Sequence, residues 1–241
     1  MAKIFITGSA DGLGLLAAKA LTDAGHSVVM HARNQQRKNE IAAKVTGVQT
    51  ILTADLSDTN ETIALAKQVN ELGKFDAVIH NAGVYNAPAK QIVAVNVLAP
   101  YILTCLIKDA ERLIYLSSGM HLHGTFDASL LEKNAGNVSY SDSKLYVLML
   151  ALAVARKRTD VYSNAVNPGW VPTKMGGRGA PDNLQKGYET QTWLATSNEA
   201  AAKVSGNYFF HKKQERFNAI ARDVAKQELL LSICKELTGV S

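Results

Sequence analysis

The glycine-rich turn at residues 7–14 constrains the fold of this chain more than any other feature. It follows a short apolar strand, Lys3–Ile6, and precedes a helix-like run, Leu15–Ala24. Its glycines are Gly8, Gly12 and Gly14. Glycine allows a tight turn and a close approach of the backbone to a ligand, and a helix N-terminus offers free N–H groups to an anion. Strand, turn and helix in this order predict a site for the pyrophosphate of a dinucleotide. A glycine turn without a ligand is the alternative.

Strand-like and helix-like segments alternate along the chain. The predicted strands are Lys3–Thr7, Ser27–His31, Gln49–Thr53, Phe75–His80, Arg112–Ser117 and Tyr162–Asn167. The predicted helices are Leu15–Ala24, Lys38–Val45, Glu61–Leu72, Lys90–Lys108 and Tyr140–Lys157. This alternation predicts an α/β fold with a single doubly wound Rossmann-type parallel sheet and helices on both faces. Ligands bind such sheets at the carboxyl ends of the strands, where we expect Gly8, Asn81, Ser118 and Asn167 to line one crevice.

We expect one NAD(P)-binding domain over residues 1–241, because no linker or repeat divides a chain that can bury one sizeable core. After Thr173 the pattern is less regular. A glycine-rich loop is expected at about 174–190, a helix with Trp193 at Gly187–Ala195, a last strand at Gly206–Phe210, and a C-terminal helical tail at about 212–238. The apolar face of that tail is expected to pack on the domain, with a lid or a subunit contact as the alternative.

Tyr140 and Lys144 are the pair with the clearest chemistry. They lie four residues apart in a segment rich in helix formers, so a helix places them on one face, one turn apart. A nearby ammonium stabilises phenolate and lowers a tyrosine pKa from about 10 toward neutral. Such a tyrosine can donate and accept a proton, as a general acid/base must. A surface pair is the alternative, because this spacing also arises by chance.

Together these motifs resemble the short-chain dehydrogenase/reductase family, and the resemblance covers nearly the whole chain. Further family motifs follow in order: Asp55-Leu56, His80-Asn81-Ala82-Gly83, Asn96, Ser117-Ser118, and Asn167-Pro168-Gly169-Trp170-Val171-Pro172-Thr173. His80 stands where the family has asparagine, at a mainly structural position. The interval of 22 residues from Ser118 to Tyr140 resembles the retinol-dehydrogenase-like and oxidoreductase-like branches.

The resemblance implies an oxidoreductase that transfers a hydride between a nicotinamide and a carbonyl or alcohol. The implied catalytic residues are Asn96, which holds a water of the proton relay, Ser118, which bonds the substrate oxygen, Tyr140, the general acid/base, and Lys144, which lowers the tyrosine pKa and bonds the nicotinamide ribose. The implied cofactor-binding residues are Gly8, Ser9, Gly12, Leu13, Gly14, Arg33, Asp55, Leu56, Asn81, Ala82, Gly83, Tyr140, Lys144, Pro168, Gly169, Val171 and Thr173. The loop at about 174–190 would cover the substrate.

Only one serine of the pair Ser117-Ser118 can face the cofactor, because successive residues in a strand face opposite sides. The family favours Ser118.

The following loop, Gly119–Val138, contains His121 and His123. With no third ligand evident, we expect loop surface there and no metal site.

The end of the second strand favours NADP(H) over NAD(H). NAD-dependent relatives usually carry an aspartate at the position of Ala32, and that carboxylate would repel a 2′-phosphate. Here Arg33 follows Ala32, and a guanidinium matches a phosphate in charge and geometry. Ser9 could add a hydroxyl donor. Asp11 weakens the phosphate site, and a surface arginine without a ligand is the alternative.

The formal net charge is +5, from 26 Lys and Arg against 21 Asp and Glu, but these charges are scattered. The tightest cluster, Arg156–Arg158, ends a predicted helix, where cations suit the dipole. We therefore expect no nucleic-acid partner. No leader and no membrane span are expected, and two cysteines, Cys105 and Cys234, suit a reducing, cytoplasmic location. A homodimer and a homotetramer both stay open.

The expected partner is a small alcohol, ketone or aldehyde. The candidate pocket residues are Tyr85, Met120, Trp170, Met175 and Trp193, which indicate an apolar or aromatic substrate or, equally, ordinary core. Two rival functions remain. A non-catalytic NAD(P)-binding regulator would not need the four catalytic residues, and a nucleotide-sugar epimerase is usually longer, with different glycine spacing.

Overall fold

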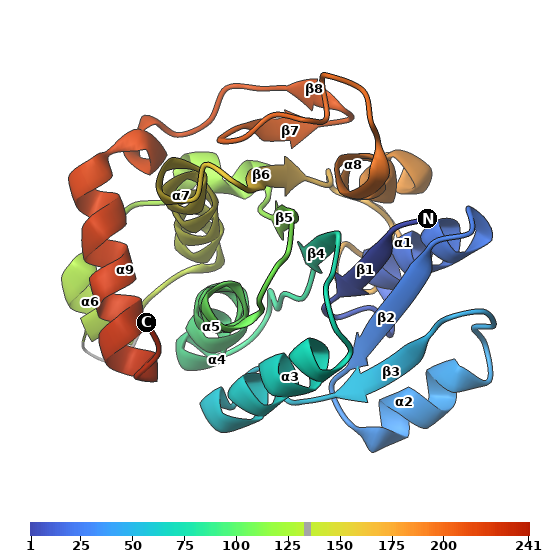
Figure 1. Cartoon of the computed structure of the whole chain (residues 1–241). Helices are drawn as coiled ribbons and strands as arrows, with labels where there is room; N and C mark the ends of the chain where they lie inside the picture. The colour runs from blue at the N-terminus through green and yellow to red at the C-terminus, as the bar shows by residue number, and fades with distance from the viewer. Residues whose placement is uncertain (133–135) are drawn as a thin grey trace.

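One eight-stranded sheet organises the protein, as the computed structural model in Figure 1 shows for residues 1–132 and 136–241. Its strand order is β3-β2-β1-β4-β5-β6-β7-β8. The strands are β1 (Lys3–Ile6), β2 (Ser27–Ala32), β3 (Thr50–Thr53), β4 (Ala77–His80), β5 (Arg112–Leu116), β6 (Tyr162–Asn167), β7 (Tyr208–Phe210) and β8 (Lys213–Gln214). Pairing from β3 through β7 is parallel, and β8 is antiparallel to β7. The predicted doubly wound sheet is confirmed.

Helices cover both faces of the sheet (Figure 1). One face carries α3 (Thr59–Glu71), α5 (Ala99–Leu106) and α7 (Tyr140–Lys157), and the other carries α1 (Gly12–Asp23), α2 (Gln35–Ala42) and α8 (Leu184–Thr196). The side chains of each strand alternate between the two cores. In β1, Phe5 packs into the first, whereas Ile4 and Ile6 pack into the second. Both faces are therefore dry, which explains why most residues of the central strands β1, β2, β4 and β5 are apolar.

The helix α7 has the bounds that the sequence predicts. It begins with a capping box: the Ser139 hydroxyl accepts from the Asp142 N–H, and the Asp142 carboxylate accepts from the Ser139 N–H. Arg156 and Lys157 lie in the last turn and both bond Glu228 of α9 (Val224–Thr238).

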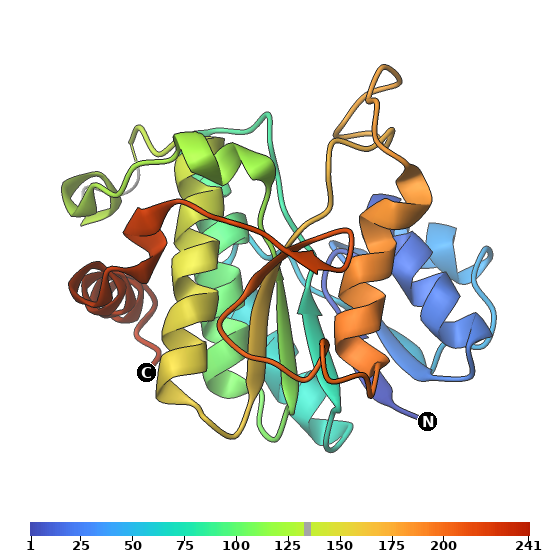
Figure 2. The same cartoon turned by 90° about the horizontal axis from the view of Figure 1, so that it is seen from above.

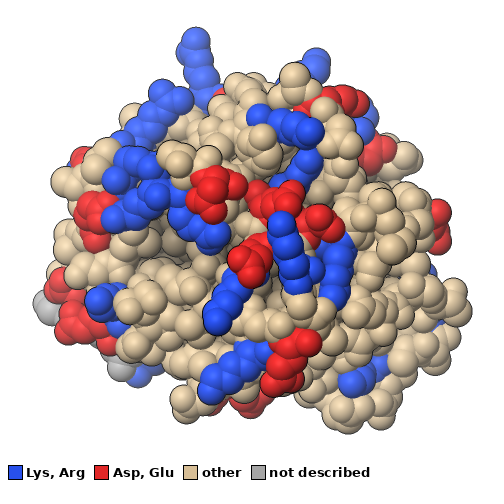
Figure 3. All heavy atoms as spheres, in the orientation of Figure 1, with Lys and Arg blue, Asp and Glu red and all other residues tan. Residues whose placement is uncertain are grey.

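In Figure 3 acidic side chains lie among the basic ones on this face of the molecule, so charges of both signs are mixed.

The predicted helix Lys90–Lys108 is interrupted by a π-helical turn. It consists of α4 (Ala89–Val93), a π-helical segment at Ala94–Leu98, and α5. Such insertions are rare and frequently occur at functional sites. Asn96 lies in this segment. The whole stretch, Ala89–Leu106, has the length and apolar composition of a membrane span, which the sequence analysis did not expect. It is 61% buried inside the fold, as a core helix is.

The C-terminal region differs from prediction. The predicted last strand is followed by β8, because His211 and Lys212 adopt positive φ angles of 48° and 64° and form a tight hairpin turn. The predicted helical tail at about 212–238 begins later than expected. A 3-10 turn at Ala219–Arg222 is capped by Asn218, and α9 begins only at Val224, capped by Asp223. The helix α9 packs on α7, in accord with the predicted packing on the domain.

The loop predicted at Gly119–Val138 is partly ordered into helix. A 3-10 helix spans Gly119–His123, and α6 spans Ala128–Glu132. Residues 133–135 lie outside the described residues. Figure 2 shows the 3-10 segment and the loop between β6 and α8 at the same end of the sheet. That end is the carboxyl end of the parallel strands, where the site lies.

Candidate active site

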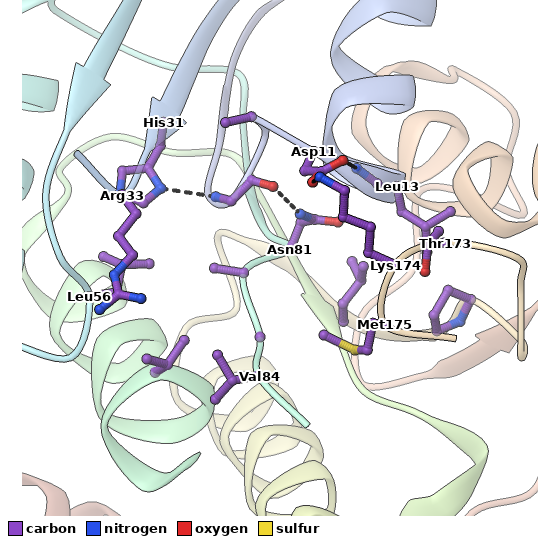
Figure 4. Close-up of a pocket in the computed structure, with 18 of the residues that line it drawn as sticks. Asp11, Leu13, His31, Arg33, Leu56, Asn81, Val84, Thr173, Lys174 and Met175 are labelled. Carbon is purple, nitrogen blue, oxygen red and sulfur yellow. Dashed lines mark hydrogen bonds and ion pairs between the residues drawn. The ribbon is translucent and has the colours of Figure 1, made fainter. Parts of the chain in front are cut away.

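A cavity of about 370 Å³ lies at the carboxyl ends of β1, β2 and β4 (Figure 4). It brings together most of the predicted cofactor-binding residues: Gly8, Gly12, Leu13, Arg33, Asp55, Leu56, Asn81, Ala82, Gly83, Tyr140, Lys144, Pro168 and Thr173. Gly169 and Val171 line a neighbouring cavity together with Ser118. Ser9 and Gly14 line neither cavity.

The glycine turn packs so tightly on the loop after β4 that side chains do not fit. A Cβ at Gly8, whose φ is +61°, would lie 2.8 Å from the Ala82 Cα. A Cβ at Gly14 would lie 2.4 Å from the Asn81 Nδ2, which donates to the carbonyl oxygens of Thr7 and Gly8. The turn therefore requires glycine at both positions, and Gly8 and Gly12 line the cavity at the N-terminus of α1, where an anion is favoured.

His31 in β2 is hydrogen-bonded to the glycine turn, a role that was not predicted from the sequence. Its Nδ1 accepts from the Gly8 N–H at 3.0 Å, and its Nε2 donates to the Ala54 carbonyl at 2.9 Å (Figure 4). The imidazole is therefore neutral and joins the ends of three strands. The only signal in the sequence was a histidine in an otherwise apolar strand. Ser9 belongs to the same network: its hydroxyl donates to the Ile6 carbonyl and accepts from the His31 N–H, and it is fully buried. The predicted role of Ser9 as a phosphate donor does not fit this position.

Burial lowers the pKa of His31 to about 4, against the opposing hydrogen bond to Ala54. The unfolded chain, with a histidine pKa of about 6.5, binds the proton more readily, so the stability contribution is complete above pH 6.5 and is lost as pH falls toward 4. We expect the unfolding free energy of the wild type to lose about 2 kcal/mol through His31 between pH 7.5 and pH 5. Urea titrations of His31→Gln should lack this part of the pH dependence. The exposed His123→Gln should keep it, and an unchanged slope in His31→Gln would contradict the assignment.

Charged side chains converge at the β2 end of the cavity. Arg33 binds the Asp55 carboxylate at 2.9 Å, and its side chain is 61% exposed. Asp11, the N-cap of α1, bonds both Arg37 at 3.0 Å and Lys174 at 2.5 Å. Asp11 is thus neutralised by two cations that the sequence analysis did not connect with it. Arg37 follows Arg33 by four residues and lies in α2, which begins at Gln35 and not Lys38 because Asn34 caps it.

Tyr140 lies where the two cavities meet. Its phenol lies beside the Ser118 hydroxyl, and the edge of its ring meets Tyr85 at 4.8 Å between centroids. Burial raises the pKa of Tyr140 to about 12, and the Ser118 hydroxyl only partly opposes this. The expectation that Lys144 lowers this pKa toward neutral is not met. The phenol is protonated at neutral pH, as a proton donor must be.

Lys144 is buried one turn along α7. Its ammonium donates to the Leu116 carbonyl at 2.7 Å and lies 5.5 Å from the centre of the Tyr140 ring. Burial lowers the pKa of Lys144 to about 8, because the charged ammonium loses contact with water. A Cβ at Gly83 would lie 3.3 Å from the Lys144 Nζ and 3.4 Å from the Asn96 Oδ1, so a side chain at this position would crowd both polar atoms.

Asn96 supports the site from behind. Its side chain accepts from the Val84 N–H at 2.8 Å and donates to the Val84 carbonyl at 3.0 Å and to Ser143 at 3.0 Å. It is buried and lines neither cavity. Its side chain therefore fixes the loop that carries Tyr85, and the expected contact with a relay water stays a prediction.

The two adjacent serines face different surroundings. Contrary to expectation, Ser117 and not Ser118 lines the first cavity, but Ser117 is buried and donates to the Lys144 carbonyl at 2.7 Å, so it ties β5 to α7. Ser118 is partly exposed, lines the second cavity and meets the Tyr140 phenol. Its Oγ also accepts from the Met120 N–H at 3.2 Å. The Ser118 hydroxyl can therefore serve a substrate oxygen, and that of Ser117 cannot.

The second cavity has a volume of about 620 Å³ and lies against Tyr140 and Ser118. Of the predicted pocket residues, Tyr85, Met120, Trp170 and Met175 line it, and Phe210 joins them. Trp193 does not: it packs on Phe209 and donates to Glu199. The expectation of surface histidines is half right. His123 is exposed, but His121 is buried and links the Ser118 carbonyl to the Asn218 N–H. Among the described residues no cluster of metal-ligating side chains occurs.

The chain is similar to a known family model, to curated proteins and to solved structures. A model of the short chain dehydrogenase family matches residues 2–184. An uncharacterized oxidoreductase of Emericella nidulans is 44% identical, with 100% of this chain and 98% of that protein covered. The short-chain dehydrogenase chry4 of Gibberella zeae is 39% identical with the same coverage. The solved NADP complex of RhlG from Pseudomonas aeruginosa has a TM-score of 0.69 at 19% identity, over 87% of this chain and 96% of that one, and so shares its fold.

Proposed function

Because this chain belongs to the short-chain dehydrogenase/reductase family of oxidoreductases, we propose that it is an NADP(H)-dependent carbonyl reductase or alcohol dehydrogenase with Tyr140 as its general acid/base. The observation that carries the proposal is the position of Tyr140. It lines both the cavity with the glycine turn and the cavity with the apolar walls, and its phenol meets Ser118. One proton donor is thus shared by a cofactor site and a substrate site.

The residues that would hold the cofactor fit a dinucleotide. The glycines of the turn line the cavity at the N-terminus of α1, which suits a pyrophosphate, and Lys144 lines the same cavity, where its ammonium would bond ribose hydroxyls. When bound, the nicotinamide supplies or accepts the hydride.

The protein supplies the proton and the position. In the reducing direction, Tyr140 donates its phenolic proton to the carbonyl oxygen, and Ser118 donates a hydrogen bond to the same oxygen. A pKa of about 12 keeps the phenol protonated until charge develops on that oxygen. Lys144, whose ammonium lies beside the Tyr140 ring, stabilises the phenolate that the transfer leaves. In the oxidising direction the same phenol oxygen takes the proton back.

The preference for NADP(H) is supported by charge at the β2 end of the cavity. Arg33 and Arg37 both line it, and Ala32 brings no carboxylate. Asp55 holds Arg33 from the side, so a 2′-phosphate would share this guanidinium. The NADP named in the RhlG complex belongs to a protein with the same fold.

We expect NADPH to bind more tightly than NADH, and Arg33→Ala to weaken NADPH binding by about 10- to 100-fold while sparing NADH. The reason is the loss of charge-assisted hydrogen bonds that only a 2′-phosphate receives. Titration of both cofactors against both proteins measures this. Arg216→Ala, which removes an exposed arginine far along the chain, is the matched control. Equal affinities in the wild type, or an equal loss for both cofactors, would refute the preference.

Activity is tested by the oxidation of NADPH with a panel of ketones and aldehydes. A cytoplasmic location is part of the proposal, and both cysteines are free thiols, which suits a reducing compartment. Failure of every carbonyl compound with both cofactors, in a protein that binds them, would favour the non-catalytic alternative.

A further inference from the structure

The cavity beside Tyr140 carries a chemical description of its ligand. Large apolar side chains are exposed there: Tyr85 by 40%, Met120 by 39%, Trp170 by 60% and Met175 by 49%. Apolar patches that soluble proteins keep exposed in a concave site usually bind an apolar ligand. A volume of about 620 Å³ is that of a site for a molecule with one or two rings and more than a few carbon atoms.

The polar groups of this cavity are few, and none of them is basic. Among the described residues that line it there is no Lys, Arg or His. Besides the phenols of Tyr85 and Tyr140, the one ionisable group among these described lining residues is Asp182, whose carboxylate accepts from the Trp170 N–H at 2.6 Å. The nearest cation along the chain, Lys174, lines the other cavity and bonds Asp11. An anionic substrate would meet a carboxylate without a counter-charge, which disfavours it by several-fold to many-fold in affinity.

Two aromatic side chains are held in place at this cavity. Tyr85 follows Val84, whose N–H and carbonyl are both bonded by the Asn96 side chain, and its ring meets Tyr140 at 83° between the ring planes. The indole of Trp170 donates its Nε1–H to the Gly176 carbonyl at 2.8 Å. Rings fixed in this way offer flat surfaces to a flat ligand at a low cost in entropy. The thioethers of Met120 and Met175 adapt to the rest of its outline.

We propose that the substrate is a neutral aromatic ketone or aldehyde, with its carbonyl attached to or next to a ring that packs on Tyr85 and Trp170. This proposal rests on the proposed function. In the reaction the carbonyl oxygen would gain the proton of Tyr140, and a bound NADPH would supply the hydride to the carbonyl carbon. The Tyr140 phenolate would regain a proton from solvent, so the overall reaction would consume one H⁺ and give a neutral benzylic-type alcohol and NADP⁺. The class of reaction that supplies such a substrate forms an aryl ketone or aldehyde, and the one that consumes the product acts on a secondary or primary alcohol.

Matched substrates test the two parts of this description. Acetophenone and benzoylformate share the ring and the carbonyl but differ in a carboxylate, and we expect kcat/KM to be at least about 100-fold lower for benzoylformate. Cyclohexyl methyl ketone keeps the size but loses the aromatic ring, and we expect a kcat/KM about tenfold lower than for acetophenone. Benzoylformate equal to acetophenone would overturn the neutral part, and cyclohexyl methyl ketone equal to acetophenone would overturn the aromatic part.

Variants locate the effect. Tyr85→Ala and Trp170→Ala should each raise KM for acetophenone by about tenfold and remove most of its advantage over cyclohexyl methyl ketone. Both side chains are exposed, so neither variant should disturb folding. Trp193→Phe alters the tryptophan outside this cavity and should leave the ratio unchanged. An aryl preference that survives in both cavity variants would overturn the assignment of these rings.

A binding measurement separates this inference from the proposed function. Quenching of tryptophan fluorescence by acetophenone and benzoylformate, in wild type and in Trp170→Ala, needs no turnover. Selective quenching by acetophenone that is lost in Trp170→Ala supports the ligand class even if no carbonyl compound is reduced, in which case only the proposed function fails. Turnover of ketones with no selective quenching and no aryl preference overturns the ligand class alone.

Discussion

Tyr140→Phe is expected to lower kcat by about 10²- to 10⁴-fold while NADPH binding stays within a few-fold of wild type, because the change removes only the proton donor. The ring edge against Tyr85 persists in phenylalanine, so the cavity keeps its shape. The contact of the phenol with Ser118 is lost, and phenylalanine has no proton to donate. Steady-state kinetics with the best ketone, together with a fluorescence titration of NADPH, measure both quantities.

Tyr162→Phe is the matched control, since Tyr162 is an exposed tyrosine at the start of β6, at the other end of the sheet. It should leave kcat unchanged. A Tyr140→Phe enzyme with near-wild-type kcat would remove the general acid from the mechanism. A large loss of NADPH affinity in the same variant would assign Tyr140 to cofactor binding.

The alternation of strands and helices and the principal helix of the site could be predicted from the sequence, because both depend on local patterns. Apolar runs bounded by turns gave β1 and β6 within a residue or two. Ser139 and Asp142 set the start of α7, and Arg156 and Lys157 mark its end, so its bounds matched. The glycine turn was predictable for the same reason, because the spacing of Gly8, Gly12 and Gly14 between a strand and a helix is a local pattern that indicates close backbone contacts.

Features that depend on tertiary contacts were not predictable. The pKa of Tyr140 is raised by burial, to which the contact with Tyr85 contributes. The spacing of four residues between Tyr140 and Lys144 in the sequence does not predict that burial. Ser9 is a turn hydroxyl in the sequence, yet the end of β2 closes over it. Trp193 has the composition of a pocket residue but lies on the face of α8 that meets Phe209. The apolar periodicity of the C-terminal tail predicts one helix, but the tail contains two N-cap residues, Asn218 and Asp223. Each of them starts a separate helical segment, so a continuous helix does not form.

Ser118→Ala is expected to lower kcat/KM by about 10²- to 10³-fold, the loss typical of one hydrogen-bond donor to a developing oxyanion. Ser118 lies in the substrate cavity, with its Oγ at the Tyr140 phenol, so its removal affects both the substrate oxygen and the proton donor. NADPH affinity should not change, because Ser118 does not line the cofactor cavity.

Ser117→Ala is the control, one residue away and of the same chemistry. It removes a buried hydrogen bond to the Lys144 carbonyl, so we expect it to cost about 1–2 kcal/mol of unfolding free energy and to change kcat/KM by only a few-fold. Urea denaturation and steady-state kinetics on both variants give a crossed result: stability falls in one and activity in the other. The opposite assignment, in two folded variants, would mean that the strand presents Ser117 to the reacting oxygen. Because successive strand residues face opposite sides, such a result would shift the register of β5 by one residue and displace the contact between Lys144 and Leu116 as well.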